Sequence, residues 1–157
     1  MTPNYEIEPI RTGCSQAAEP ILRSVPEWFG IESATQKYIK AADTMPTILV
    51  SSEEATAGFL TIERHFPESA EIHCIAVHRD HHGRGLGRLL VEAAETHLAL
   101  EGVRFLQVKT ISPEREDPNY ARTRGFYTAM GFQPVEVFPE LWDPENPCLQ
   151  MMKILDP

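Results

Sequence analysis

Two ionisable side chains inside one short apolar run are the first candidates for chemistry. Glu71 and His73 stand two residues apart in the run 71–77, which reads EIHCIAV. Because side chains alternate along a strand, one face of this run carries the set Glu71, His73, Ile75 and Val77. A carboxylate and an imidazole in a row are costly to bury without a purpose. Both are therefore candidate proton acceptors, and the alternative is that they face solvent at the open end of a sheet.

A glycine-rich turn follows this run. The hexapeptide His82-Gly83-Arg84-Gly85-Leu86-Gly87 leads into an apolar stripe at helical spacing. A strand, a glycine turn and a helix N-terminus together make an anion site, because free N–H groups and the helix dipole point at the ligand. A dinucleotide fingerprint would need glycine at position 88, which is Arg88, and the chain contains no P-loop string.

Charge is unevenly distributed along the chain. With 14 basic and 23 acidic residues the formal net charge is −9, which disfavours nucleic acid as a partner. Positive charge gathers at the glycine turn, in the set Arg79, His81, His82, Arg84 and Arg88. The acidic remainder would favour a cationic substrate by steering, or would simply keep the protein in solution.

Length and composition indicate one domain over residues 1–157, with 42% hydrophobic and 24% charged residues. We find no apolar run of membrane-spanning length and no secretory pattern at the N-terminus. The cysteines, Cys14, Cys74 and Cys148, are odd in number and far apart, which argues against disulfides and zinc and favours a reducing cytoplasm. We therefore expect no metal. Parity along the strand places Cys74 opposite Glu71, as a core residue.

Hydrophobic periodicity predicts the elements that position these residues. We expect strands at Tyr5–Ile10, Thr47–Ser51, Gly58–Glu63, Glu71–Val77, Val103–Ile111, Gln133–Phe138 and Cys148–Leu155. We expect helices over Cys14–Phe29, where Pro26 ends or bends the helix, over Ser33–Ala42, from Gly85 to a stop at Gly102, and from Asp117-Pro118 to Met130. The third of these helices is a crossover, so the strands that it joins are expected to be parallel. Residues 139–147 read as a long loop, which either presents acids and Trp142 to an amine or pins a hairpin.

A second motif lies in the last of these helices. Residues 126–132, FYTAMGF, contain Tyr-x-x-x-Gly-Phe at Tyr127. With the glycine hexapeptide, it makes residues 70–155 resemble the GCN5-related N-acetyltransferases (GNATs), whose loop reads [Gln/Arg]-x-x-Gly-x-[Gly/Ala]. The chain departs from that loop at His82. The resemblance implies an α/β GNAT fold. This is a mixed sheet of about seven strands, antiparallel at its centre and with a parallel pair splayed at the cofactor site, and about four helices.

The resemblance also implies acetyl-CoA as the cofactor and gives roles to residues. The diphosphate would be bound by the loop residues His82, Gly83, Arg84, Gly85, Leu86, Gly87 and Arg88. The pantetheine arm would be bound by the strand backbone at Ile75, Ala76 and Val77 and by Asn119 or Tyr120, although Tyr120 stands where the family often has asparagine. Glu71 and His73 stand where arylalkylamine N-acetyltransferases carry His-x-His as proton acceptors.

Two further roles follow from the same resemblance. Tyr127 would protonate the coenzyme A thiolate, with buried packing as the alternative. The segment that contains Trp28, Phe29 and Tyr38 would line the acceptor pocket, with core packing as the alternative.

The expected reaction is transfer of an acetyl group from acetyl-CoA to a primary amine of a small, cationic acceptor, by direct attack in a ternary complex. Two alternatives stay open: acetylation of a protein or peptide, and a non-catalytic acyl-CoA-binding module. We expect no nucleic-acid or membrane partner, and hydrophobic closing strands make a homodimer plausible.

Overall fold

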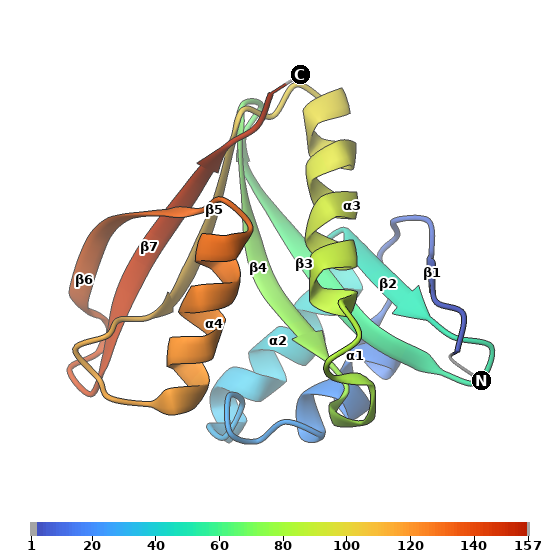
Figure 1. Cartoon of the computed structure of the whole chain (residues 1–157), viewed down its shortest axis with the longest axis horizontal. Helices are drawn as coiled ribbons and strands as arrows, with labels where there is room; N and C mark the ends of the chain where they lie inside the picture. Colours follow the sequence, from blue (N-terminus) through green and yellow to red (C-terminus); the bar gives the residue numbers. More distant parts are fainter. Residues whose placement is uncertain (1–2, 157) are drawn as a thin grey trace. The chain divides into compact units, whose positions relative to one another are not determined.

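The computed structural model describes residues 3–156, and over these residues it contains four α-helices and seven strands (Figure 1). The helices are α1 (Ser15–Arg23), α2 (Glu32–Thr44), α3 (Leu86–Leu100) and α4 (Pro118–Ala129), with a short 3-10 turn η1 (Arg79–His81). The strands are β1 (Glu6–Ile7), β2 (Thr47–Ser51), β3 (Thr56–Phe66), β4 (Ser69–Val77), β5 (Phe105–Ile111), β6 (Gln133–Asp143) and β7 (Asn146–Ile154). Their order in the sheet is β1-β2-β3-β4-β5-β7-β6. The predicted fold class is confirmed.

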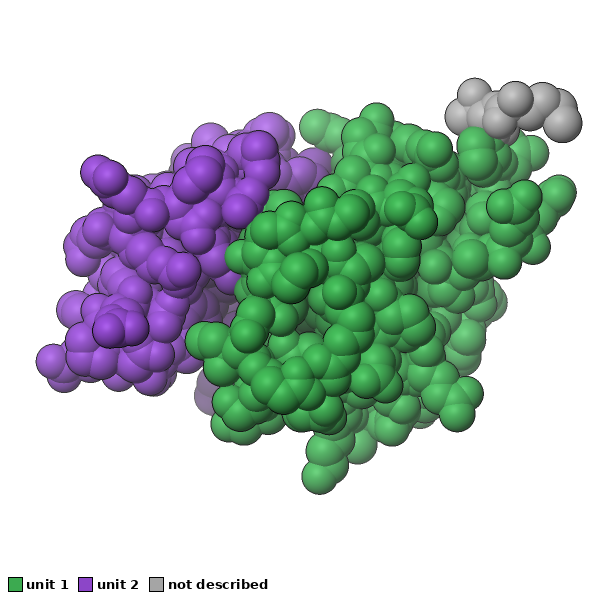
Figure 2. Space-filling view, turned by 90° about the horizontal axis from the view of Figure 1, so that it is seen from below, with its two compact units in different colours: residues 1–63, 73–98 green, residues 64–72, 99–157 purple. Residues whose placement is uncertain are grey.

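The chain divides into two compact units, which Figure 2 colours separately. Within the described chain, unit 1 contains residues 3–63 and 73–98, and unit 2 contains residues 64–72 and 99–156. Strands β3 and β4 each contribute to both units.

The core of unit 1 forms where α1 and α2 pack on the sheet. One cluster joins Ala18, Ile21 and Leu22 of α1, Ile39 and Ala42 of α2, and Leu49, Phe59, Cys74 and Ala76 of the strands. The alternation predicted for β4 is confirmed over residues 72–77, since Ile72, Cys74 and Ala76 are buried while the residues between them are partly exposed.

Helix α3 packs across the strands at a glycine. A Cβ at Gly58 would lie 3.0 Å from Val50 Cγ1, 3.1 Å from the carbonyl oxygen of Ala76 and 3.3 Å from Leu90 Cδ1. Leu90 belongs to α3, so only glycine at this position lets the helix approach so closely.

In unit 2, β4 and β5 pair in parallel from Ser69↔Phe105 to Ile72↔Val108. β7 then pairs antiparallel with β5 and with β6. Helix α4 lies against β5 (Figure 1). The Arg124 guanidinium of α4 donates to the carbonyl oxygen of Ile111 at 2.7 Å. The expected helix start is confirmed, because the Asp117 carboxylate accepts from Asn119 N–H at 2.9 Å with Pro118 next in the chain.

Several boundary predictions were wrong, and three differences stand out. The first strand is only two residues long, followed by an isolated bridge between Arg11 and Thr47. Helix α1 ends at Arg23, three residues before Pro26, which was predicted to end or bend it. Pro26 lacks the N–H that another turn needs, and residues 25–29 form a separate turn on the carbonyl of Val25.

The third error concerns the expected loop at 139–147. Strand β6 continues to Asp143 with shifts in register, and its carboxylate accepts from Glu145 N–H and from the Asn146 side chain, both at 2.9 Å. These bonds close a tight hairpin. Prolines suggested a loop, but an edge strand tolerates them.

Within residues 3–156, none of the helices is long and apolar enough to span a membrane.

Candidate active site

The glycine turn of unit 1 adopts the backbone that its sequence requires. Gly83 and Gly85 have φ angles of +76° and +75°, a region that other residues rarely adopt. The carbonyl of Gly85 accepts from Leu89 N–H at 3.1 Å, which starts α3. Residues 82–85 are exposed, so the first N–H groups of α3 follow directly on an exposed turn. This arrangement can bind a phosphate anion.

Arg84 is fixed by an aromatic side chain from the N-terminal segment. Its guanidinium donates to the Tyr5 hydroxyl, which in turn lies 2.7 Å from Nδ1 of His81. Burial and then the Arg84 charge lower the pKa of His81, so the imidazole is neutral at pH 7. Both partners of Arg84 are uncharged, so its positive charge is available to an anion.

Unlike Arg84, the other two arginines near the turn, Arg79 and Arg88, lie next to carboxylates. Arg79 forms a bidentate ion pair with Glu27, and this hydrogen bond lowers the pKa of the Glu27 carboxyl. Arg88 lies 3.5 Å from Glu92 on the same helix. The predicted gathering of positive charge is therefore partly compensated, and Arg84 contributes the most available charge.

His82, where the family motif has Gln or Arg, links the turn to the preceding strand. Its Nε2 lies 2.7 Å from the carbonyl oxygen of Val77. A carbonyl only accepts, so Nε2 carries the hydrogen. The ring also meets Trp28 edge-on at 6.3 Å between centroids. The substitution thus supplies a hydrogen bond that fixes the start of the turn.

Three of the predicted residues in unit 1 form one partly exposed cluster. The Tyr38 ring meets His73 at 5.4 Å and Phe29 at 5.6 Å between centroids. Nδ1 of His73 lies 3.4 Å from Oε2 of Glu63. The cluster combines aromatic faces, an imidazole and a carboxylate, groups that suit an organic cation.

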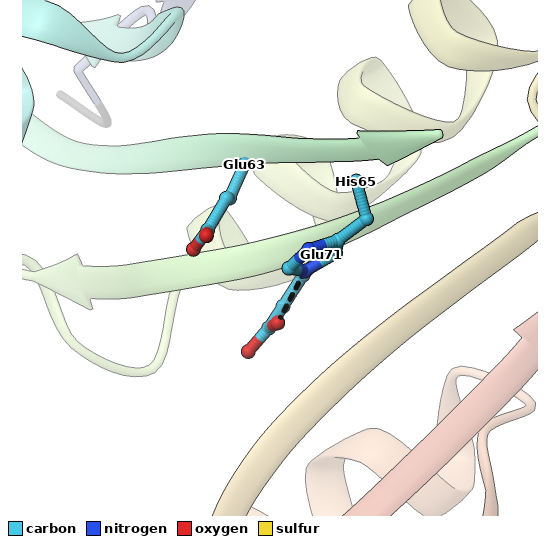
Figure 3. A group of neighbouring side chains, drawn as sticks. All are labelled: Glu63, His65 and Glu71. Atoms are coloured by element: carbon cyan, nitrogen blue, oxygen red, sulfur yellow. Dashed lines mark hydrogen bonds and ion pairs between the residues drawn. The ribbon is translucent and has the colours of Figure 1, made fainter. Parts of the chain in front are cut away.

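Glu71 belongs to unit 2 and is buried, with 7% exposure. Its Oε1 accepts from Lys109 Nζ at 2.9 Å and lies 2.8 Å from Nε2 of His65 (Figure 3). The alternative that Glu71 faces solvent is wrong, and sequence reasoning missed both partners of its carboxylate. The signal for Lys109 was its parity on β5, because it shares a face with Gln107, the register partner of Glu71.

Tyr127 is buried in unit 2, at 4% exposure. Its ring meets Phe126 at 5.4 Å and Phe132 at 5.6 Å between centroids. At the other end of α4, Asn119 accepts from Arg122, and the Arg115 guanidinium lies 5.8 Å from the Tyr120 ring centroid. The Tyr-x-x-x-Gly-Phe motif therefore seats its tyrosine in an aromatic cluster.

Residues 45–134 match the family model described as an acetyltransferase (GNAT) domain. The chain belongs to the GNAT acetyltransferase family. An uncharacterised N-acetyltransferase of Chlorobaculum tepidum is 35% identical over 86 residues, which are 53% of this chain and 48% of that protein. The match thus spans about half the length of that relative.

Solved GNAT structures share the fold. A GNAT-family acetyltransferase from Desulfovibrio desulfuricans has a TM-score of 0.83 at 16% identity, with 98% of this chain and all of that chain covered. The ribosomal-protein-S18-alanine N-acetyltransferase of Escherichia coli has a TM-score of 0.78 at 17% identity, covering 98% and 96%. A structure named yncA from Salmonella typhimurium, with acetyl-CoA, has a TM-score of 0.73 at 17% identity, covering 98% and 95%. These identities support the fold alone.

Trp142 and Cys74 are the two other residues that the sequence analysis considered. Trp142 lies near the end of β6, 43% exposed, rather than on a long loop. Cys74 is buried, and desolvation raises the pKa of its thiol. A buried thiol of raised pKa is a poor nucleophile, which agrees with its assignment to the core.

Proposed function

We propose that this GNAT, acting as a single domain over residues 1–157, transfers an acetyl group from acetyl-CoA to a primary amine of a small, cationic acceptor. One observation carries the proposal: a glycine turn with two left-handed glycines opens directly into the N-terminus of α3. The family match and the acetyl-CoA in the Salmonella structure support coenzyme A as the ligand of this turn.

The residues of the turn divide the binding of the cofactor between them. N–H groups at the start of α3 hydrogen-bond to the diphosphate, while Arg84, whose partners Tyr5 and His81 are uncharged, adds a positive charge. His82 fixes the turn through the carbonyl of Val77. The backbone at Ile75, Ala76 and Val77 and the side chains of Asn119 and Tyr120 are proposed to bind the pantetheine arm.

The acceptor is proposed to bind the cluster of Phe29, Tyr38 and His73. Aromatic faces attract a cation, and Glu63 adds a carboxylate next to His73. The net charge of −9 favours the approach of such a cation. Trp28 and Trp142 are proposed as further contacts.

The chemistry needs a proton acceptor and a proton donor. The ammonium must lose a proton before its nitrogen can attack the thioester carbonyl, and Glu71 or His73 is proposed to receive it, directly or through water. Tyr127 is proposed to protonate the departing thiolate, because a phenol can give up its proton to a strongly basic thiolate. The reaction then needs no covalent enzyme intermediate.

The test measures release of free thiol from acetyl-CoA against polyamines, aminoglycosides, amino acids and alanine-ended peptides. We expect turnover with small cationic amines, and Tyr127→Phe should lower kcat about 10- to 100-fold with unchanged acetyl-CoA affinity. Phe126→Leu, which alters a ring in contact with Tyr127, is the matched control for packing and should keep most of the rate.

Other outcomes would support other functions. Acetyl-CoA binding without turnover of any amine would point to a binding module. Turnover of peptides alone would point to a protein N-acetyltransferase, which is the activity named for the Escherichia coli structure. A protein that does not bind acetyl-CoA would contradict the proposal outright.

A further inference from the structure

One oxygen of Glu71 is shared by two donors in unit 2. Oε1 lies 2.9 Å from Lys109 Nζ and 2.8 Å from His65 Nε2. The Glu71 side chain is 9% exposed and that of Lys109 26%, while that of His65 is 31% exposed. The Glu71 carboxylate is thus buried, and its hydrogen-bond partner His65 is partly exposed to solvent.

These contacts determine which nitrogen of His65 carries the hydrogen. The Glu71 carboxylate forms an ion pair with the Lys109 ammonium at 2.9 Å. An ionised carboxylate only accepts hydrogen bonds, so Nε2 of His65 must donate. The lone pair of the neutral ring therefore lies on Nδ1, and proton uptake there produces an imidazolium bound to a carboxylate.

We propose that His65 is the proton acceptor of acetyl transfer, with Glu71 as the carboxylate that orients it and Lys109 as a positioning residue. This inference rests on the proposed acetyl transfer and makes His65, in place of Glu71 or His73, the group that receives the proton. Glu71 then acts through His65 rather than as the base itself, in the same division of roles as a histidine–aspartate pair in a hydrolase. Figure 3 shows His65 and Glu71 joined in this way, from neighbouring strands β3 and β4.

The proposed step balances in protons and electrons. The acceptor ammonium gives one proton to Nδ1 of His65, through water, and His65 later releases it to solvent. The neutral nitrogen forms the C–N bond as the C–S bond breaks, and the electron pair of that bond goes to sulfur. Tyr127 protonates the sulfur and recovers a proton from the acylated nitrogen. The products are the amide, free coenzyme A and one proton.

The Glu63 carboxylate also faces this pair, because ligand atoms of Glu63, His65 and Glu71 all lie within 4.8 Å of one another (Figure 3). Cys148 on β7 lies near Lys109 and Glu71, and desolvation raises the pKa of its thiol to about 11, so it is neutral at pH 7. Gln107 and Gln150 form a hydrogen bond of 2.5 Å between β5 and β7 and carry no charge. Glu63, Glu71 and Lys109 are thus charged groups that influence proton uptake at His65.

The test is the pH profile of kcat/KM for acetyl transfer by the full chain. His65→Gln should lower kcat about 100-fold and remove the acidic limb, with unchanged acetyl-CoA affinity. Glu71→Gln should lower kcat with unchanged acetyl-CoA affinity, because His65 loses the carboxylate that orients it. In His65→Ala, added imidazole should restore part of the rate, which a purely structural role would not allow. His97→Gln, the same change on α3, is the matched control.

The outcomes separate this inference from the proposed function. A wild-type enzyme that acetylates amines while His65→Gln keeps both its rate and its acidic limb overturns the His65 role alone. Loss of the acidic limb in His73→Gln, with the limb kept in His65→Gln, would make His73 the proton acceptor and would also overturn the His65 role. Activity that a chelator removes and zinc restores would instead make the group of Glu63, His65 and Glu71 a metal site. Wild-type protein without turnover of any amine defeats both proposals.

Discussion

At the scale of residues, the ionised carboxylate of Glu71 depends on its partners. A buried carboxylate loses most of its hydration, and Lys109 and His65 replace that water with hydrogen bonds. The same contacts that would orient His65 for catalysis therefore stabilise the strands β3, β4 and β5 that carry them.

Removing the cation should reveal this dependence. We expect Lys109→Met to lower the free energy of unfolding by about 3 kcal/mol, because an unpaired charge would be left buried. The double variant Lys109→Met/Glu71→Gln should recover part of the loss. Urea denaturation of the two single variants and the double variant measures the coupling.

An exposed ion pair serves as the control for that cycle. Arg23 and Glu32 form a salt bridge with side chains 39% and 63% exposed, so Glu32→Gln should change stability little. An equally small effect of Lys109→Met would show that solvent reaches the Glu71 carboxylate and that Lys109 is not needed to hold its charge.

The sequence alone led to Glu71 and His73 but not to their neighbours. Alternation along the run 71–77 was sufficient to propose both as candidates, since it needs no knowledge of other strands. His65 was missed because the third strand was expected to end at Glu63, and it continues to Phe66. Partners across a sheet depend on register, which local patterns do not determine.

At the scale of elements, the glycine turn shows how closely sequence can determine structure. The left-handed φ of Gly83 and Gly85 can be expected from an exposed glycine-rich turn before an apolar helix. The start of α4 at Asp117-Pro118 was equally predictable, because capping is local. The extent of β6 was not, because its pairing with β7 outweighs two prolines.

An alanine at Gly83 should test the turn. Nothing lies within 4 Å of a Cβ built there, so the cost is the left-handed backbone itself, about 1 kcal/mol. If the turn changes conformation to relieve that cost, acetyl-CoA binding should weaken about fivefold, measured by calorimetry.

At Gly125, in contrast to Gly83, we expect substitution by alanine to raise stability. Gly125 lies in α4, also with nothing within 4 Å of a built Cβ, and its φ is not positive. Gly125→Ala should therefore raise stability by about 0.5–1 kcal/mol. Unchanged acetyl-CoA binding in Gly83→Ala would show that the turn does not contact the cofactor.

At the scale of the whole molecule, the net charge of −9 should affect substrate capture. Steering by such a field raises the encounter rate with a cation and is screened by salt. We expect kcat/KM for a polyamine to fall several-fold as ionic strength rises from about 0.02 to 0.3 M. The value for an amine that also carries a carboxylate, and so has no net charge, should stay nearly constant. Equal effects of salt on kcat/KM for the two amines would show that the net charge of the protein does not favour a cationic acceptor.

Strand β6 stands at the end of the strand order and contains Pro134 and Pro139. Each proline lacks the N–H that a neighbouring chain would need to extend the sheet. The apolar side chains of Leu141 and Trp142 are nevertheless 54% and 43% exposed on the same strand. In concentrated solution this edge strand should resist fibril growth. Any association of two copies along β6 would rest on reversible hydrophobic contacts rather than on a continuous row of backbone hydrogen bonds.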